Sequence, residues 1–527
     1  MSKIPINKNV DIIAQFADQA FDQKDIQTLK SIAEDSLEKF NSPEYSKLDR
    51  AILVYHGATS YANYISLVHN GVMQYSEESN NESDFEFCIY LYRKSLDFFR
   101  AFRENNDSWN KADAIEKQYY SNYLQMLYVN YANDLNQCGR LLQSISQLQH
   151  GVASHFSMAV GNMAAKLITY GQYDYDIGHS HIFFKEAHHL LLEALEGDLH
   201  EDARLIFLRQ KEWLEKYFPE DFLEEPYSLK DISLGETNEE KNYRMWCLEN
   251  TFFLNTLNDA FYYPLVAHDC IHLPEIVTDI QTGYKFHGLF NQLKQEYVSA
   301  RFMIYDGLHN RGEHYSDKDV LMYNTLDYPI YGLSIEMVKC AFRSLYSLFD
   351  RIAFFINDYF ELGIKERDVS YKSIWEGRKG GKGGYEYSLD LKKAMTGTDT
   401  YNLPLIGLYW LFKDVGKKEI KHDYLEPAIK QISDIRHSLE HRYFKLHDSL
   451  FVPHEEPALS DTLAKSVKID VFKSTCMQLL RYSREAIILL VLAVHREEQL
   501  RNEQRDANRL VAHMYLDKFE DTWKQIF

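Results

Sequence analysis

The residues best suited to chemistry stand close together in the hexapeptide RHSLEH, residues 436–441. Histidine titrates near neutral pH and can transfer a proton, whereas the arginine guanidinium keeps its charge and can hold an anion. Arg436 and His441 could therefore act together on an anionic substrate, with His437 as a further contact to the same anion. The same spacing also has a purely structural interpretation. Arg436 and Glu440 would then form an ion pair worth about 0.2 to 0.5 kcal/mol, and the histidines would be polar surface residues.

These residues belong to a segment, about 424–447, whose apolar pattern predicts a helix packed against a core. At about 100° per residue, His441 points away from Leu439 and hence away from that core. Arg436 and His441 are about 140° apart around the helix, which is awkward for a compact site built by one chain. The apolar positions follow one another at spacings of three, four and seven residues: Ile432, Ile435, Leu439 and Leu446.

Other helices must position this segment. Residues 325–363 predict a long buried helix after Pro329, and residues 467–505 predict a final long helix. The chain has only 23 Gly and 11 Pro in 527 residues, and no strand pattern of convincing length appears. The sequence therefore predicts an all-α fold.

In this context RHSLEH resembles the R-x4-6-H signature of the HEPN ribonucleases, in which a polar residue, here His437, commonly follows the arginine. HEPN domains are all-α bundles in which the signature helix packs beside a long apolar first helix, here residues 325–363. The three predicted helices are similar to a prokaryotic HEPN subfamily that is often fused to N-terminal tetratricopeptide-like repeats. The resemblance covers about residues 290–505.

The resemblance implies a metal-independent endoribonuclease that leaves a 2′,3′-cyclic phosphate. Such transphosphorylation requires a base for the 2′-hydroxyl, an acid for the 5′-oxygen and a cation against the charge of the phosphorane. By the resemblance, His441 is the proton-transfer residue and Arg436 is the phosphate clamp. In the family, two copies of the motif face each other across a dimer cleft, so we expect a homodimer acting on RNA, plausible as a toxin or anti-phage effector.

Tyr443 extends the motif to RHSLEHRY, which also fits the longer R-x4-H-x-Y form. In some HEPN toxins of that form, a partner nucleotidyltransferase antitoxin adenylylates the tyrosine and silences the nuclease. Tyr443 also lies seven residues after Arg436 and thus on the same side of a regular helix. The sequence favours a core position for it over a regulatory one.

A basic loop precedes the motif helix. Residues 365–393 hold eight Lys or Arg and five acids, and they include GRKGGKGG at 377–384, which is not a phosphate-binding loop of the Walker A type. We expect either a mobile arm that touches RNA phosphates or a flexible solvated loop. The residues that would make the contacts are Arg378, Lys379 and Lys382.

Two histidine-rich segments could suggest a metal. HDCIH (268–272) and the HSH and HH pairs within residues 179–189 lack a matching second pair of ligands nearby in the sequence. No metal site is expected, and no motif points to a cofactor.

The charge of the chain is uneven. Residues 1–240 hold 38 acidic and 21 basic residues, whereas residues 241–527 hold 40 and 37, so the net charge of -20 is almost all N-terminal. Six scattered cysteines without a CxxC pair, no signal-like N-terminus and a longest aliphatic run of nine residues predict a soluble cytoplasmic protein without membrane contact.

The N-terminal part reads as paired helices with small residues where neighbours touch. Segments 17–37, 131–148 and 161–195 each show a helix with Ala or Gly, a short polar turn and an apolar helix. This resembles degenerate tetratricopeptide repeats, which build a concave surface for a peptide or protein ligand, here a basic one because the surface is acidic. The array could instead only cap the C-terminal domain.

The predicted organisation is a repeat domain over 1–217, a linker over 218–245, a helical connector over 246–324, a HEPN domain over 325–510 and a helical tail over 511–527. The repeat domain would regulate the nuclease. The alternative is a non-catalytic repeat scaffold whose C-terminal bundle mediates oligomerisation.

Overall fold

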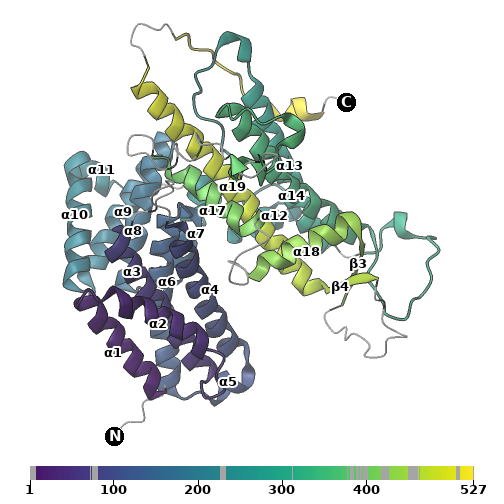
Figure 1. The fold of residues 1–527 in the computed structure, drawn as a ribbon. Coiled ribbons are helices and arrows are strands. Elements are labelled where there is room, and N and C mark those ends of the chain that lie inside the picture. The colour runs from purple at the N-terminus through teal and green to yellow at the C-terminus, as the bar shows by residue number, and fades with distance from the viewer. Residues whose placement is uncertain are drawn as a thin grey trace.

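The structure is a computed structural model. It describes residues 7–71, 73, 81–225, 233–310, 312–376, 378–379, 385–386, 391, 395, 401–416, 427–448, 461, 463–505 and 511–525. Helices dominate it, which confirms the predicted all-α fold class (Figure 1). Among the helices of these residues, none is both long and apolar enough to cross a bilayer.

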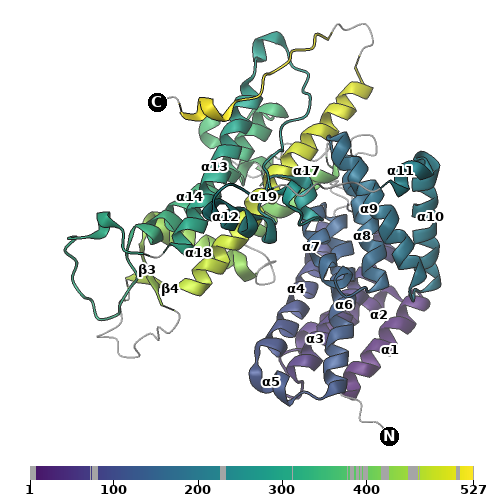
Figure 2. The same ribbon diagram turned by 180° about the vertical axis from the view of Figure 1, so that it is seen from behind.

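The N-terminal half is an array of helices that pack in chain order, drawn in purple and blue in Figures 1 and 2. The predicted helix pairs coincide with α1–α2, α6–α7 and α8–α9, so the pairing is confirmed, while membership in the tetratricopeptide family stays a prediction. The bounds are α1 (Lys8–Asp22), α2 (Ile26–Lys39), α3 (Lys47–His69), α4 (Glu82–Glu104), α5 (Asn106–Lys111), α6 (Ala114–Gln137), α7 (Leu141–Val152), α8 (Ser157–Tyr173), α9 (Ile177–Glu196), α10 (Glu201–Tyr217) and α11 (Glu220–Glu224).

Small residues lie where these helices touch. A Cβ added to Gly161 of α8 would lie 2.2 Å from the ring of Phe207 in α10. A Cβ on Gly171 would lie 2.8 Å from the ring of Phe184 in α9. Both glycines therefore allow the close packing that the sequence predicted for this segment.

The C-terminal half is a bundle around one long helix. α13 and α14 pack along each other and on α19, and α19 also contacts α17 and α18. Residues 482–494 of α19 are buried without interruption, so this helix forms the centre of the bundle. The bounds are α12 (Asn238–Glu249), α13 (Lys285–His309), α14 (Leu333–Tyr359), α15 (Ser373–Glu376), α17 (Leu403–Gly416), α18 (Pro427–His441) and α19 (Ile469–Glu503).

The predicted connector and tail contain less regular helix than expected, whereas the predicted linker contains more. α11 and the start of α12 fall in the predicted linker 218–245. The connector is irregular between α12 and α13, and residues 511–520 of the predicted helical tail contain no helix. The 3-10 helices are η1 (Thr256–Asp259), η2 (Pro264–Val266), η3 (Ile280–Thr282), η4 (Tyr315–Asp317), η5 (Glu366–Asp368) and η7 (Asp521–Gln525).

The helix predicted over about 424–447 ends early. α18 stops at His441, and the chain continues as β3 (Tyr443–His447), which pairs in parallel with β4 (Ala464–Lys468). The expectation that no convincing strand exists is therefore wrong at this point. A second, two-residue pair joins β1 (Arg378–Lys379) to β2 (Tyr385–Glu386).

The apolar spacing that suggested a longer helix has another cause. Leu446 is buried, as the helical stripe required, but it is buried from β3. The Ile330 N–H donates to the Leu446 carbonyl at 2.7 Å, so β3 has backbone partners on both sides. Backbone hydrogen bonds to these two segments, rather than the intrinsic propensity of residues 443–447, therefore determine that this part of the chain forms a strand.

α17 joins the two halves through a buried ion-pair cluster. Asp414 of α17 is fully buried and accepts hydrogen bonds from Arg93 of α4 at 2.7 and 2.9 Å. Asp414 also accepts from Arg140, which precedes α7, and Arg140 donates to Glu485 of α19 at 2.8 and 3.0 Å. Two guanidiniums and two carboxylates thus hold the array, α17 and α19 together.

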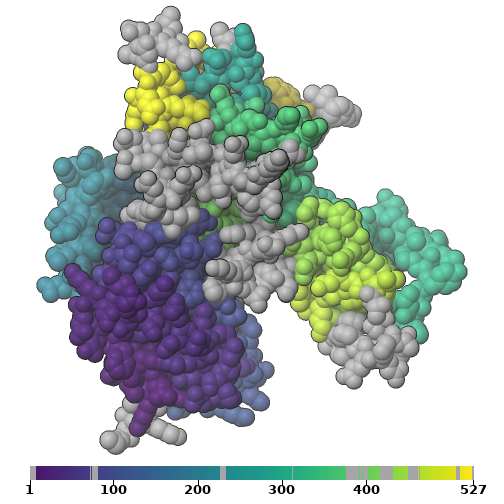
Figure 3. Space-filling view, viewed as in Figure 1, coloured from purple at the N-terminus to yellow at the C-terminus, as the bar shows by residue number. Residues whose placement is uncertain are grey.

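Residues 315–333, here called the projecting arm, extend from the bundle beside β3 (Figures 1 and 3). Lys445 of β3 contacts Asp327 at the base of the arm at 2.6 Å. The large apolar and aromatic side chains of the arm nevertheless face solvent, with Leu321 and Tyr323 being 84% and 85% exposed. The others are Tyr315, Val320, Met322, Leu326, Tyr328, Tyr331 and Leu333.

Candidate functional site

α18 holds the candidate residues on a helix that is fixed on its opposite side. Ile432, Ile435 and Leu439 are buried, as the apolar stripe predicted. Arg343 of α14 donates to the Leu439 carbonyl at 2.8 Å. A cation at this carbonyl satisfies one of the free acceptors that every helix C-terminus leaves, so the end of α18 is anchored where the candidate residues lie.

The candidate residues form a compact group at that end, which we call the α18 site. The His441 side chain is 64% exposed, so it points away from the core as predicted. The ring of His437 lies one turn earlier, with centroids 5.4 Å apart and an edge-to-face geometry. Glu440 lies between the two predicted catalytic residues, since its Oε2 is 3.1 Å from Arg436 Nε and 3.6 Å from His441 Nε2.

A residue of α14 packs against the side chain of Arg436. The Arg436 guanidinium lies over the ring of Tyr346 in α14, 4.5 Å from the centroid. Burial raises the pKa of Tyr346, and the charge of Arg436 partly opposes that rise. The tyrosine therefore stays neutral and offers its ring face to the cation. Arg436 itself is 38% exposed, so part of its guanidinium remains open to a ligand.

The arrangement places an imidazole that can transfer protons near a guanidinium that can bind an anion. The carboxylate of Glu440 lies between the two groups. The Arg436–Glu440 ion pair of the purely structural interpretation is present. A phosphate that reaches Arg436 must compete with Glu440, and the same carboxylate can orient the imidazole of His441. The spacing in the sequence suggested the pair but not its contact with the histidine.

Tyr443 is not in the core. It opens β3 and is 45% exposed, so the favoured core position was wrong. The error follows from the early end of α18, because a strand turns this side chain away from the helical stripe. Its ring lies 5.1 Å from Lys445 Nζ. An exposed tyrosine is what a regulatory modification would need, and that role stays a prediction.

The Gly-rich part of the basic loop, residues 377–384, lies mostly outside the described residues. Arg378 and Lys379 form β1, of which only the backbone pairing is described. Lys382 lies outside the described residues. Their contact with RNA phosphates therefore stays a prediction.

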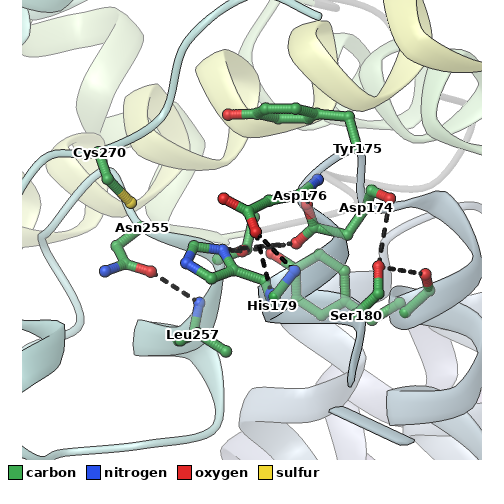
Figure 4. A network of polar contacts seen from close by, with 12 residues as sticks. Asp174, Tyr175, Asp176, His179, Ser180, Asn255, Leu257 and Cys270 are labelled. Atoms are coloured by element: carbon green, nitrogen blue, oxygen red, sulfur yellow. Dashed lines mark hydrogen bonds and ion pairs between the residues drawn. The ribbon is translucent and has the colours of Figure 1, made fainter. Parts of the chain in front are cut away.

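The structure brings the two histidine-rich segments together in a polar network (Figure 4). The Thr256 hydroxyl donates to the buried carboxylate of Asp174 at 2.6 Å, and His179 Nδ1 lies 2.8 Å from the same hydroxyl. The His272 N–H donates to the Tyr175 hydroxyl at 2.9 Å. Burial raises the pKa of Asp174 to about 6 and lowers that of His179.

This network ties the turn between α8 and α9 to the irregular connector. Within the part of the chain that the structure describes, no group of three or more potential ligands could hold a metal ion. The contacts of the two motifs run through Thr256 and Tyr175, which belong to neither motif, and their spacing in the sequence did not show this.

Two positioning residues were missed by sequence reasoning. Tyr346 and Arg343 belong to the long apolar helix α14, about 90 residues before the motif. Their positions in the amphipathic pattern gave no sign that they would meet α18, because the contact depends on how the helices cross.

The C-terminal half is thus an all-α bundle with Arg436 and His441 at the end of a core-packed helix. Residues 277–497 match the family described as LA2681-like HEPN, so α13 belongs to the matched domain together with α14, α18 and most of α19. No curated protein and no solved structure matched the chain.

Proposed function

We propose that this protein is a metal-independent endoribonuclease that cleaves RNA by transphosphorylation. The observation that carries the proposal is the exposed group of Arg436, Glu440 and His441 at the anchored end of α18 in a HEPN domain. Further support comes from Tyr346, whose ring packs against the guanidinium of Arg436 and so restricts its position.

In the proposed reaction the 2′-oxygen attacks the adjacent phosphorus while the bond to the 5′-oxygen breaks. The proton of the 2′-hydroxyl passes to an imidazole, and the leaving 5′-oxygen takes a proton from an imidazolium. Arg436 balances the negative charge of the phosphorane. The products are a 2′,3′-cyclic phosphate and a 5′-hydroxyl.

The two proton transfers ask for two imidazoles, and a second copy of the chain can supply the other one. The projecting arm supports such a dimer, because a contiguous exposed apolar surface of this kind marks a contact with another protein. It stands beside β3, which directly follows His441, so a partner bound to the arm would lie next to the α18 site.

The array would regulate this activity, as a receptor for a basic peptide or protein or through the contact of α17 with the bundle. In a toxin or anti-phage setting, modification of the exposed Tyr443 by a nucleotidyltransferase would be a second control. A non-catalytic scaffold is the competing function, and the Arg436–Glu440 pair favours it because the carboxylate neutralises the charge of the arginine.

RNA cleavage in EDTA separates the two functions. The wild-type chain should cut RNA to products with a 2′,3′-cyclic end, and His441→Ala or Arg436→Ala should each lower the rate by roughly 10² to 10⁴. The exposed residues His513 and Arg209 provide matched controls, since His513→Ala and Arg209→Ala should leave the rate unchanged. Full activity in both α18 variants would contradict the proposal.

Light scattering tests the dimer. The full-length chain should have twice the mass of one chain, and Leu321→Ser with Tyr323→Ser in the arm should release monomers with reduced activity. Tyr515→Ser is the control, since Tyr515 is 92% exposed outside the arm. A wild-type monomer that cuts RNA would show that one chain completes the site.

A further inference from the structure

A cavity lies where the projecting arm leaves the bundle. Its volume is about 380 Å³, within the usual range for sites that hold small molecules. The arm and the residues just before it form most of the walls, and the first residues of α14 and α19 complete them. We call this cavity the arm pocket.

The arm pocket lies beside the α18 site, because both adjoin β3 (Figures 1 and 2). Ile330 lines the pocket, and its N–H donates to the Leu446 carbonyl of β3 at 2.7 Å. Burial raises the pKa of Tyr331, which also lines the pocket, and a hydrogen bond to Tyr443 raises it further. Tyr443 follows His441 by two residues, which keeps their α-carbons within about 8 Å of each other. An RNA strand at the α18 site can therefore place a neighbouring base in the pocket.

The lining can hold a planar aromatic ligand. Ile335 of α14 and Ile469 of α19 are buried and form the apolar side towards the bundle. On the side of the arm, Met322 and Tyr331 are 53% and 49% exposed, so the thioether and the ring remain open to a ligand. Unpaired bases of single-stranded RNA stack on aromatic rings that are open in this way.

Two carboxylates give the arm pocket its charge. Asp317 Oδ2 accepts from the Leu333 N–H at 2.9 Å, which fixes this carboxylate at the start of α14. An ionised carboxylate has about four positions for hydrogen bonds, so Asp317 can accept from further donors. Glu313 is exposed, and its carboxylate can turn towards the pocket that it lines. Both groups repel phosphates and accept hydrogen bonds, so they favour a base that donates.

Among the four RNA bases, guanine matches these acceptors best. Its Watson–Crick edge carries two adjacent donors, N1–H and the N2 amine, which one carboxylate can accept through two parallel hydrogen bonds. In adenine and cytosine the donor amine stands next to a ring acceptor, and in uracil one N–H stands between two carbonyl oxygens. The remaining acceptor of guanine, O6, can accept from the hydroxyl of Ser334, which also lines the pocket.

We propose that the arm pocket binds a guanine base of the RNA next to the phosphate held at the α18 site. Glu313 and Asp317 accept from the Watson–Crick edge, and the ring of Tyr331 stacks on the base. This inference rests on the proposed function and assigns the base specificity of its substrate. Cleavage then occurs beside unpaired guanines, because base pairing would cover the edge that the carboxylates contact.

The affinity of the full-length chain for oligonucleotides that cannot be cut tests the proposal. A short 2′-O-methyl oligouridine lacks the attacking hydroxyl, and its central base is changed to guanine, hypoxanthine or adenine. Hypoxanthine differs from guanine only in lacking the N2 amine. Fluorescence anisotropy should show at least about tenfold tighter binding of the guanine oligonucleotide, as expected for one hydrogen bond to a charged acceptor. Adenine should bind no better than hypoxanthine.

Variants of the lining locate the site. Glu313→Gln or Asp317→Asn should reduce the guanine preference to less than about threefold, because an amide offers one acceptor oxygen in place of two. The Asn amide oxygen can still accept from the Leu333 N–H, so the start of α14 is kept. Tyr331→Ala should weaken the guanine and hypoxanthine oligonucleotides by a similar factor, since stacking does not depend on the amine.

Asp319→Asn is the matched control, because Asp319 is an exposed acid of the arm outside the lining, and it should keep the full preference. Equal affinity of the wild type for guanine and hypoxanthine would overturn the proposal. An unchanged preference in both Glu313→Gln and Asp317→Asn would overturn it as well.

The same oligonucleotides separate this inference from the proposed function. His441→Ala should lose most of its cleavage and keep the guanine preference in binding, since His441 does not line the pocket. A wild-type chain that binds guanine selectively but cuts no RNA would contradict the proposed function and support the pocket. A chain that cuts RNA without any guanine preference would contradict the pocket alone.

Discussion

Replacement of Asp414 by asparagine should destabilise the whole chain. Asn keeps the shape of the side chain but removes one of the two carboxylates that face Arg93 and Arg140. Arg93 would then lose this carboxylate partner, whereas Arg140 would keep Glu485. Removing one partner from a buried ion pair costs about 3 to 5 kcal/mol, because the remaining charge cannot return to water. We expect a loss of unfolding free energy in that range.

A surface pair sets the scale for comparison. Lys39 and Asp35 contact each other at 3.1 Å with side chains that are 46% and 51% exposed. Such pairs contribute about 0.3 to 0.5 kcal/mol, so Asp35→Asn should change the stability by no more than that. Comparing the loss of unfolding free energy in Asp414→Asn and Asp35→Asn therefore separates the effect of burying an ion pair from the effect of forming one.

The loss of unfolding free energy caused by Asp414→Asn should also depend on pH. Arg93 and Arg140 hold the pKa of Asp414 below its usual 3.8, although burial opposes them. Because the folded pKa is depressed, the stabilisation is present above the unfolded pKa and is lost as the pH falls through the folded value. The difference between wild type and Asp414→Asn should be constant from about pH 5 to 8 and shrink below about pH 4.

Urea unfolding followed by circular dichroism measures these differences as shifts of the midpoint at unchanged slope. The double variant Arg93→Met with Asp414→Leu should cost less than the sum of its single changes, because it removes the unpaired charge. A loss of less than about 0.5 kcal/mol for Asp414→Asn would refute the reasoning.

Two further predictions concern other parts of the chain. Burial raises the pKa of Asp174 to about 6 from 3.8, so the ionised carboxylate costs the folded state up to about 3 kcal/mol above pH 6, and this cost disappears as the pH falls towards 3.8. In urea unfolding, Asp174→Asn should therefore be more stable than wild type at pH 8 and lose that advantage by pH 4, and a difference that is independent of pH would contradict the assigned cause. In the basic loop, Glu at Arg378, Lys379 and Lys382 together should weaken RNA binding and lower its salt dependence by up to about one unit of log–log slope for each lost phosphate contact. Unchanged binding at several salt concentrations would exclude these residues from the interface.

Sequence analysis predicted the long helices whose apolar spacing is visible within their own residues. α14 spans Leu333–Tyr359 and α19 spans Ile469–Glu503, close to the predicted 325–363 and 467–505. Long amphipathic helices bury one face wherever they pack, so their apolar spacing is enough to find them. The outward direction of His441 followed from the same argument.

The features that sequence analysis missed depend on contacts between distant segments. β3 needs β4 and Ile330 as partners, neither of which its own residues reveal. α17 is apolar on nearly every side and was not singled out, since a fully buried helix lacks an amphipathic pattern. The contact between Arg436 and Tyr346 likewise depends on the way α14 and α18 cross.

The place of α17 in the chain has a consequence for synthesis in the cell. Arg93 is separated from Asp414 by 321 residues. At about 5 to 20 residues per second, the ribosome delivers the carboxylate roughly 15 to 65 s after the arginine. The array must wait that long for the carboxylate of Asp414 to reach Arg93. Because α18 follows α17, the residues of the α18 site leave the ribosome only after α17, the helix on which the array docks.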